Sequence, residues 1–119
     1  MAADKKRAGD FGENYAARYL EALGYGIIAR NYRSRFGEID LIAENDRFLL
    51  FVEVKTRRRG AMVRGEEAVD ARKQEKLRLT AEYYLSREET RLQPRFDVIC
   101  IELWPNGAVY NVNHYENAF

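Results

Sequence analysis

The sequence predicts an α/β fold in which a mixed central sheet of about five strands is flanked by helices. Short apolar runs typical of strands occur together with two longer segments whose apolar residues recur at helical spacing. In the second half, a strand, a helix and a further strand follow one another, which implies a parallel strand pair joined by a helical crossover. The length of 119 residues, without repeats or a Pro/Gly/Ser linker, is typical of a single domain over residues 1–119.

The first predicted element is a helix over residues 10–23. The segment at 10–13 resembles a capping box, in which a glutamate three residues after the N-cap returns a hydrogen bond to the backbone. Aromatic and aliphatic residues then recur at helical spacing, and a glycine offers a stop. These periodic residues are Phe11, Tyr15, Tyr19 and Leu23, followed by Gly24.

Three predicted strands follow this helix. Residues 25–32 form the first, which is broken by the polar stretch at 33–37. Residues 38–44 and 48–56 form the second and third, and the polar turn between them closes a hairpin.

The second half of the chain predicts one helix and two strands. Residues 66–86 have an apolar stripe typical of an amphipathic helix. Residues 96–103 are rich in Val and Ile, as buried strands are, and a turn at 104–107 leads into a last strand over 108–113. The order is therefore αβββαββ, with the fourth strand parallel to the third.

Composition narrows the class of protein. Hydrophobic residues make up 46% of the chain, which is enough for a core and excludes a disordered protein. Cys100 is the lone cysteine, no window approaches the roughly 18 apolar residues of a membrane span, and the N-terminus has no signal core. We therefore expect a cytoplasmic protein that is not inserted in a membrane.

The positive charge is concentrated locally, although the net charge is only +1. A domain that binds nucleic acid through its overall charge usually has a pI above about 9, which this chain lacks. Between positions 55 and 64, however, basic residues occur without an acidic one. They are Lys55, Arg57, Arg58, Arg59 and Arg64. The arginines of this cluster are candidates for phosphate contacts in a flexible loop, and a merely solvated edge is the alternative.

Strand alternation brings three charged residues together. In the second strand Asp40 shares a face with Glu38 and Ile42, and in the third Glu53 shares a face with Lys55. If the hairpin closes at residues 45–48, Asp40 lies opposite Glu53, with their Cβ atoms about 5 Å apart. We therefore predict that Asp40, Glu53 and Lys55 converge on one face of the hairpin.

Two carboxylates this close in an apolar strand pair need a compensating group. A hard divalent cation would compensate them, since Mg²⁺ commonly takes one or two carboxylates and keeps several waters that substrate phosphate can replace. Lys55 would point toward the same water and phosphate. A structural ion-pair network is the alternative interpretation.

At this point the residues resemble a known pattern. Residues 37–40 read GEID and residues 51–57 read FVEVKTR, after a helix that contains GxxGE at 9–13. Together they resemble the D…ExK motif of the PD-(D/E)XK restriction-endonuclease-like superfamily. The whole chain is similar to the bacterial YraN family, an uncharacterised, endonuclease-like family related to archaeal Holliday-junction resolvases. The predicted order also agrees with the αβββαβ core of that superfamily.

The resemblance implies specific roles. Asp40 and Glu53 would be metal ligands for Mg²⁺ or Mn²⁺, Lys55 would orient or help deprotonate the attacking water, and Glu13 would reach the site from the first helix. The implied chemistry is metal-assisted phosphodiester hydrolysis. Lys73 would approach a substrate phosphate from the second long helix. The alternative is that the aliphatic part of the Lys73 side chain packs on the protein while its ammonium group reaches solvent. The alternative interpretation of Glu13 is that it is the glutamate of the capping box at residues 10–13, which returns a hydrogen bond to the backbone.

Two further polar residues favour structural roles. His114 is the only histidine, and a single histidine supports neither a catalytic triad nor a zinc site. Asp97, flanked by Arg95 and Phe96, is predicted to make a structural hydrogen bond or ion pair, and a functional role is the alternative because Asp97 belongs to a stretch that resembles a family motif.

Three functions follow as hypotheses. The first is a metal-dependent endonuclease that acts on nucleic acid, with DNA and branched or structured DNA as the expected substrates. The second is a catalytically weak or inactive nucleic-acid-binding accessory protein with a nuclease fold. The third is a module whose arginines contact an acidic protein. A homodimer is expected by analogy, because a small nuclease that cuts both strands needs two sites.

Overall fold

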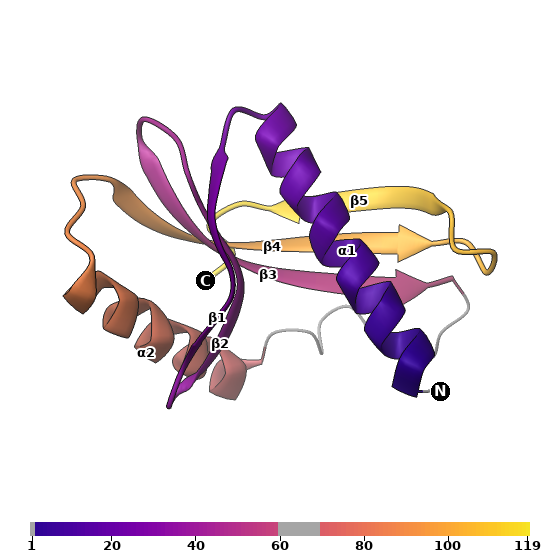
Figure 1. Cartoon of the computed structure of the whole chain (residues 1–119), viewed down its shortest axis with the longest axis horizontal. Coiled ribbons are helices and arrows are strands. Elements are labelled where there is room, and N and C mark those ends of the chain that lie inside the picture. Colours follow the sequence, from indigo (N-terminus) through magenta and orange to yellow (C-terminus); the bar gives the residue numbers. More distant parts are fainter. Residues whose placement is uncertain (1, 60–69) are drawn as a thin grey trace.

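The computed structural model describes residues 2–59 and 70–119 and contains one mixed five-stranded sheet with two helices (Figure 1). The elements are α1 (Ala2–Ala22), β1 (Gly26–Ser34), β2 (Gly37–Glu44), β3 (Phe48–Arg58), α2 (Ala71–Arg87), β4 (Gln93–Leu103) and β5 (Val109–Tyr115). The strands lie in the order β1-β2-β3-β4-β5, and only the β3–β4 pair is parallel. The predicted α/β class and the parallel crossover are confirmed.

The two helices cover opposite faces of the sheet. α1 buries Ala16, Ala17 and Leu20 against one face, and α2 buries Leu77 and Ala81 against the other. The strand residues under α1 are Leu41, Ala43, Leu50, Val52, Ile99, Ile101 and Leu103. Those under α2 are Ile39, Ile42, Leu49 and Phe51. No helix in the described part of the chain is long and apolar enough to cross a membrane.

Both helices begin at positions other than the predicted ones. α1 is already helical at Ala2, so the capping box at residues 10–13 is wrong, because those residues lie inside the helix. α2 begins at Ala71, and the side chain of its N-cap residue Asp70 accepts a hydrogen bond from the Lys73 amide at 2.8 Å. The part of the predicted helix at 66–69 lies outside the described residues.

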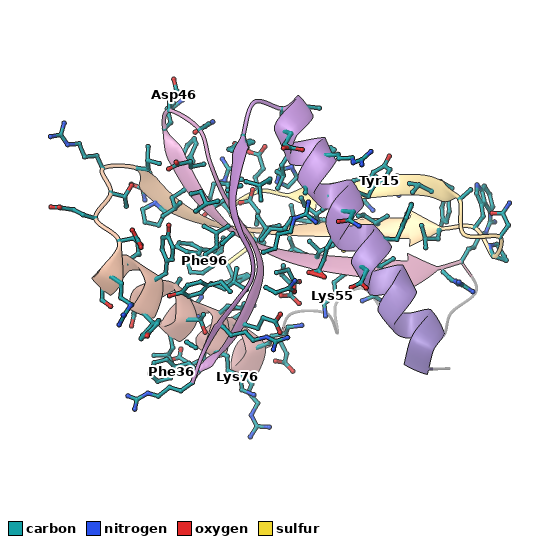
Figure 2. All side chains as sticks on the ribbon, viewed as in Figure 1. Tyr15, Phe36, Asp46, Lys55, Lys76 and Phe96 are labelled. Atoms are coloured by element: carbon teal, nitrogen blue, oxygen red, sulfur yellow. The ribbon has the colours of Figure 1, made fainter. Side chains whose placement is uncertain are left out.

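The polar stretch at 33–37 is not the predicted break. β1 continues to Ser34, which pairs with Gly37, so a two-residue turn joins β1 to β2. Ser34 Oγ accepts a hydrogen bond from the Phe36 amide at 3.0 Å and lies 3.1 Å from Thr80 Oγ1 of α2. Figure 2 shows Phe36 at the tip of this hairpin, close to Lys76 of α2. The hairpin thus extends over α2.

The simple alternation predicted for β2 is also wrong. Ile39 packs with Ile42 on the α2 side, whereas Leu41 and Ala43 pack on the α1 side. Residues 39 and 42 can share a side only if the alternation breaks between them. The break falls at Asp40, one of the predicted site residues.

Candidate functional site

The sheet forks at Asp40. The ladder between β2 and β3 ends at the pair Leu41–Val52, and β2 then continues with β1 alone as far as Gly37. In Figure 1 this hairpin curves away from β3 toward α2. The Asp40 carboxylate takes the place of the lost ladder bond, since its Oδ2 accepts a hydrogen bond from the Val54 amide at 2.8 Å. Asp40 is thereby fixed beside β3.

The fork brings the carboxylates of Asp40 and Glu53 together. If the β2–β3 register is continued by one residue beyond the pair Leu41–Val52, Asp40 lies opposite Glu53, as predicted. The two strands are joined at this position by the Asp40 side chain and not by backbone hydrogen bonds of the ladder. Glu53 is only 6% exposed. Burial and then the neighbouring Glu53 carboxylate raise the pKa of Asp40 to about 7, although the Val54 N–H opposes the shift.

Two lysines surround Glu53. Lys55 Nζ lies 3.4 Å and Lys73 Nζ 2.5 Å from Glu53 Oε1. Burial and the adjacent Lys73 lower the pKa of Lys55. Burial acts to lower the pKa of Lys73 as well, but the contacts with Glu53 and Lys55 and the negative charges of Glu53 and Asp40 together outweigh burial and raise that pKa. Lys73 reaches this position because the capped first turn of α2 points at β3. Lys55 is labelled in Figure 2.

Glu13 reaches the same region from α1, through a residue that the sequence analysis missed. With the Asn31 amide oriented so that its NH₂ group faces the carboxylates, its nitrogen lies 2.8 Å from Glu13 Oε1 and 2.9 Å from Glu38 Oε1. Burial, and then the acidic neighbours Asp10 and Glu38, raise the pKa of Glu13. Asn31 has a φ of 51°, in the left-handed region that Asn tolerates better than most residues. An Asn next to the end of the predicted strand at 25–32 was the available signal.

A cavity of about 210 Å³ lies at this fork, and carboxylates and lysines surround it. It is lined by Gly37, Glu38, Asp40, Glu53, Lys73, Lys76 and Leu77. Among the side chains that the structure describes, in residues 9–59 and 70–119, no three His, Cys, Asp or Glu residues are grouped as a ready metal site. Asp40 and Glu53 nevertheless fit a Mg²⁺-type ion, which needs one or two carboxylates and retains waters. The repulsion that raises the pKa of Asp40 is what such a cation would relieve.

The predicted arginine loop differs from the structure. Arg57 and Arg58 belong to β3, which pairs with β4 as far as Leu103, so these two arginines do not lie in a loop. Arg59 follows the strand and places its guanidinium 4.8 Å from the Trp104 ring centroid. Arg64 lies outside the described residues.

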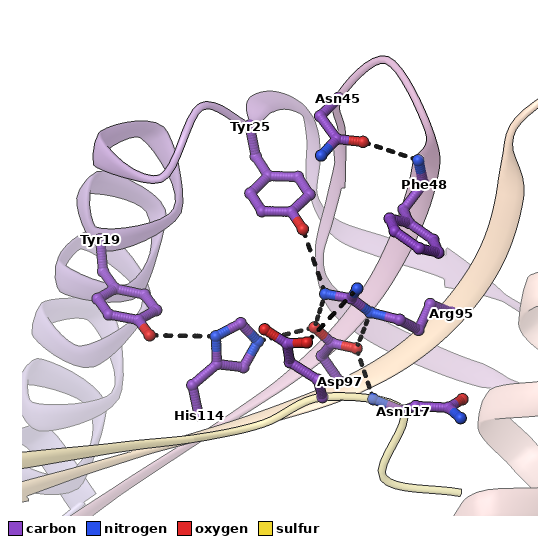
Figure 3. A network of polar contacts seen from close by, with 9 residues as sticks. Tyr19, Tyr25, Asn45, Phe48, Arg95, Asp97, His114 and Asn117 are labelled. Atoms are coloured by element: carbon purple, nitrogen blue, oxygen red, sulfur yellow. Dashed lines mark hydrogen bonds and ion pairs between the residues drawn. The ribbon is translucent and has the colours of Figure 1, made fainter.

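A second polar cluster, on the α1 side of the sheet, is structural as predicted (Figure 3). Asp97 is fully buried, and Arg95 donates to both of its oxygens at 2.9 and 2.8 Å. His114 Nε2 lies 2.7 Å from Asp97 Oδ2, and His114 Nδ1 lies 3.1 Å from the hydroxyl of Tyr19 in α1. Burial acts to raise the pKa of Asp97, but the hydrogen bonds from His114, Arg95 and the Asn117 amide outweigh it and lower that pKa. The cluster ties α1 to β4 and β5.

Comparison with known proteins identifies similar chains but no activity. The profile of a family described as Uncharacterised protein family UPF0102 matches residues 12–101. A UPF0102 protein of Symbiobacterium thermophilum is 48% identical over 115 residues, which cover 96% of this chain and 97% of the relative. A UPF0102 protein of Sulfurihydrogenibium sp. is 42% identical over 119 residues, which cover 98% of this chain and 96% of that relative. A UPF0102 protein of Dictyoglomus turgidum is 38% identical over 117 residues, which cover 98% of this chain and 99% of that relative.

Proposed function

The chain belongs to the uncharacterised protein family UPF0102, and we propose from the geometry of its site that it is a metal-dependent nuclease that hydrolyses phosphodiester bonds of nucleic acid, with DNA as the substrate. One observation carries the proposal. At the fork of the sheet, Asp40 and Glu53 face a cavity from adjacent strands, and Glu53 contacts the Lys55 ammonium. The resemblance of GEID and FVEVKTR to the PD-(D/E)XK pattern supports the same assignment.

Asp40 and Glu53 are the residues that would hold Mg²⁺ or Mn²⁺. When bound, such a cation lowers the pKa of a coordinated water and offsets the negative charge that develops on phosphate. Lys55 would orient the attacking water, because its Nζ lies 3.4 Å from Oε1 of Glu53, and Glu53 lines the cavity. Lys73 would exchange its contact with Glu53 for one with a substrate phosphate. Glu13, held by Asn31, would complete the negative rim of the site.

Cleavage assays on defined substrates test this proposal. Labelled duplex, single-stranded and four-way-junction DNA, together with single-stranded RNA, would be incubated with Mg²⁺ or Mn²⁺. We expect cleavage of DNA by the wild type and a loss of at least about 100-fold in Asp40→Asn and Glu53→Gln, because each removes one ligand charge. Glu44→Gln, at the exposed end of β2, is the matched control and should cleave like the wild type. Undiminished activity in both site variants would show that the site is assigned wrongly.

One observation favours the second candidate function, a nucleic-acid-binding accessory protein with little hydrolysis of its own. The Lys73 ammonium lies 2.5 Å from Glu53 Oε1, so Glu53 is compensated without a cation. Calorimetric titration with Mn²⁺ separates the two functions. A wild type that binds DNA but no Mn²⁺ supports the accessory function. Mn²⁺ binding that strengthens in Lys73→Met, where the competing ammonium is gone, supports the nuclease.

A further inference from the structure

The structure points to a second nucleic-acid contact outside the carboxylate site. We infer that Trp104 and Tyr110 form a stacking platform for an unpaired base, so that the preferred substrate carries a single-stranded segment next to the cleaved bond. This inference rests on the proposed function, since the carboxylate site defines where the strand is cut. The platform is defined here as Trp104, Tyr110 and Arg59.

The platform is an exposed aromatic pair on a rigid turn. The ring centroids of Trp104 and Tyr110 are 4.6 Å apart, and the two residues remain 39% and 36% exposed. The Trp104 amide donates to the Ala108 carbonyl at 2.7 Å, and the Gly107 amide donates to the Trp104 carbonyl at 2.8 Å. Trp104 therefore opens a closed hairpin turn, Tyr110 follows that turn at the start of β5, and both rings are partly open to solvent. Exposed aromatic rings on rigid backbone are the usual surface on which single-stranded bases stack.

The platform lies next to the C-terminal end of β3, on the face of the sheet that carries Glu53. Along β3, Glu53, Lys55 and Arg57 alternate onto one face. Arg57 is the partner of Glu102 in β4, and Glu102 accepts a hydrogen bond from the Tyr110 hydroxyl at 2.6 Å. The six residue steps from Glu53 to Arg59 span about 20 Å at the rise of a strand. A strand cleaved at Glu53 would thus reach the platform within a few nucleotides.

The charge along this path matches a phosphate backbone. Lys55, Arg57 and Arg59 are basic and alternate onto this face, whereas Arg58 lies on the other face. Glu102, a carboxylate beside the path, accepts hydrogen bonds from Tyr110, Asn111 and Asn113. The hydrogen bonds from Tyr110 and Asn111 lower the pKa of Glu102, so it stays ionised. Beyond Glu53, the three cations of this face outnumber Glu102.

Arg59 supplies the third part of the platform. Its guanidinium lies 4.8 Å from the Trp104 centroid and 5.8 Å from that of Tyr110. A guanidinium beside aromatic rings adds a phosphate contact and a second planar surface for a base. The backbone of Arg59 is anchored as well, because its amide donates to the Leu103 carbonyl at 2.7 Å. Stacking groups and a cation thus meet at one point, as single-strand binding requires.

Tryptophan fluorescence reads this contact directly, because Trp104 is the only tryptophan of the chain. The full-length protein would be titrated in EDTA, so that no metal-dependent cleavage occurs. The three ligands are an oligothymidylate, an abasic strand of the same length and a blunt duplex of the same length. We expect strong quenching by oligothymidylate and little by the other two, because only the first offers unpaired bases. Equal quenching by the abasic strand would overturn the inference.

Variants measure the contribution of each ring. In fluorescence anisotropy with labelled oligothymidylate, Trp104→Ala and Tyr110→Ala should bind about tenfold more weakly, as expected for the loss of one stacked base. Tyr110→Phe keeps the ring and should bind like the wild type. Tyr83→Ala is the matched control, because Tyr83 of α2 is also 36% exposed and lies away from the platform. Circular dichroism would show that each variant is folded. Unchanged affinity in folded Trp104→Ala would contradict the platform.

The outcomes separate the platform from the nuclease. Cleavage with Mg²⁺ but no base-dependent quenching would leave the proposed function standing and overturn the platform. Base-dependent quenching without cleavage would support the platform and favour the accessory function over the nuclease. If neither is found and the aromatic surface captures a protein, the platform is overturned.

Discussion

Asn31 illustrates how one residue can determine the shape of the site. Its left-handed backbone lies between the pairs Arg30–Leu41 and Tyr32–Ile39, and thus across from Asp40, where the sheet forks. Its amide can donate to Glu13 and Glu38 at once, as an amide NH₂ group carries two hydrogens. The neutral amide therefore holds two carboxylates near each other without adding charge.

Asn31→Asp is expected to destabilise the protein, and more so as pH rises. Asp keeps the shape and tolerates left-handed backbone, but it replaces a donor by a third carboxylate. Since burial and acidic neighbours already raise the pKa of Glu13, a further carboxylate raises it more. A carboxyl whose pKa is higher in the folded state loses stability as pH rises from the unfolded pKa through the folded one. We expect a loss of about 1–3 kcal/mol at pH 8, and less at pH 5.

Urea unfolding at both pH values measures this loss. Asn31→Gly is the control, because it keeps the backbone conformation and removes the amide without adding charge. An equal loss for both variants at pH 8 would show that the amide does not balance the two carboxylates.

The residues of the site were predictable in part. Strand alternation predicted that Asp40, Glu53 and Lys55 meet, since they lie on a hairpin with a clear turn. It could not predict the fork, because the point at which two strands separate leaves no periodic signal. Asn31 was missed for a related reason: its role depends on a backbone angle and on partners from α1 and β2.

At the scale of elements, the approach of α1 to β3 sets how far Glu13 reaches. Gly12 makes the approach possible, since a Cβ at that position would lie 1.8 Å from Thr56 Oγ1. No real Cβ atom tolerates such a distance. Glu13 follows Gly12 directly, so the position of Glu13 depends on this contact between helix and strand.

Gly12→Ala should therefore destabilise the wild-type protein but not a variant in which the Thr56 side chain has been removed. In the wild type we expect a loss of about 1–3 kcal/mol, because the methyl group forces α1 and Thr56 apart. In a Thr56→Gly background, which also removes the Cβ that would lie 3.1 Å away, the same change should be neutral or stabilising by up to about 1 kcal/mol, since alanine is the better helix former. Thermal and urea unfolding of the four proteins in this double-mutant cycle measure the reversal. Equal losses in both backgrounds would contradict the contact.

The elements themselves were predicted in kind, but several of their ends were not. The early start of α1 was missed because residues 2–9 lack an apolar stripe. β1 was ended too soon because its last residues are polar, although exposed positions of an edge strand tolerate polar side chains. In β1, the pairing of Arg33 with Glu38 and of Ser34 with Gly37 extends the strand beyond its hydrophobic pattern.

At the scale of the whole molecule, Asp97 connects parts of the chain that are distant in sequence. It joins Arg95 in β4, His114 in β5 and the Asn117 amide, and through His114 it reaches Tyr19 in α1. A buried carboxylate with so many donors stabilises the fold mainly because leaving the donors unpaired is costly.

Asp97→Asn should cost about 3–5 kcal/mol near pH 7, because it leaves buried Arg95 without its countercharge. The folded pKa of Asp97 is lowered, so its contribution is present above the unfolded pKa and is lost as pH falls through the folded one. The difference from the wild type should therefore shrink below about pH 4. Glu116→Gln, which removes an exposed partner of Arg95 at 3.7 Å, should change stability little. Urea unfolding between pH 3 and 7 checks both; a pH-independent difference would contradict the assignment.

The parallel pairing of β3 with β4 has a consequence for how the molecule folds. Each pair from Phe48–Gln93 to Arg58–Leu103 joins residues about 45 positions apart, so a long loop must close before the pair forms. Until β4 is synthesised, β3 has an apolar edge without a partner, which is a hazard for aggregation on the ribosome. Stopped-flow refolding should accordingly be slower than that of helical proteins of this size, in milliseconds to seconds. Glu53, in the middle of β3, would then reach its final setting only after almost the whole chain has been made.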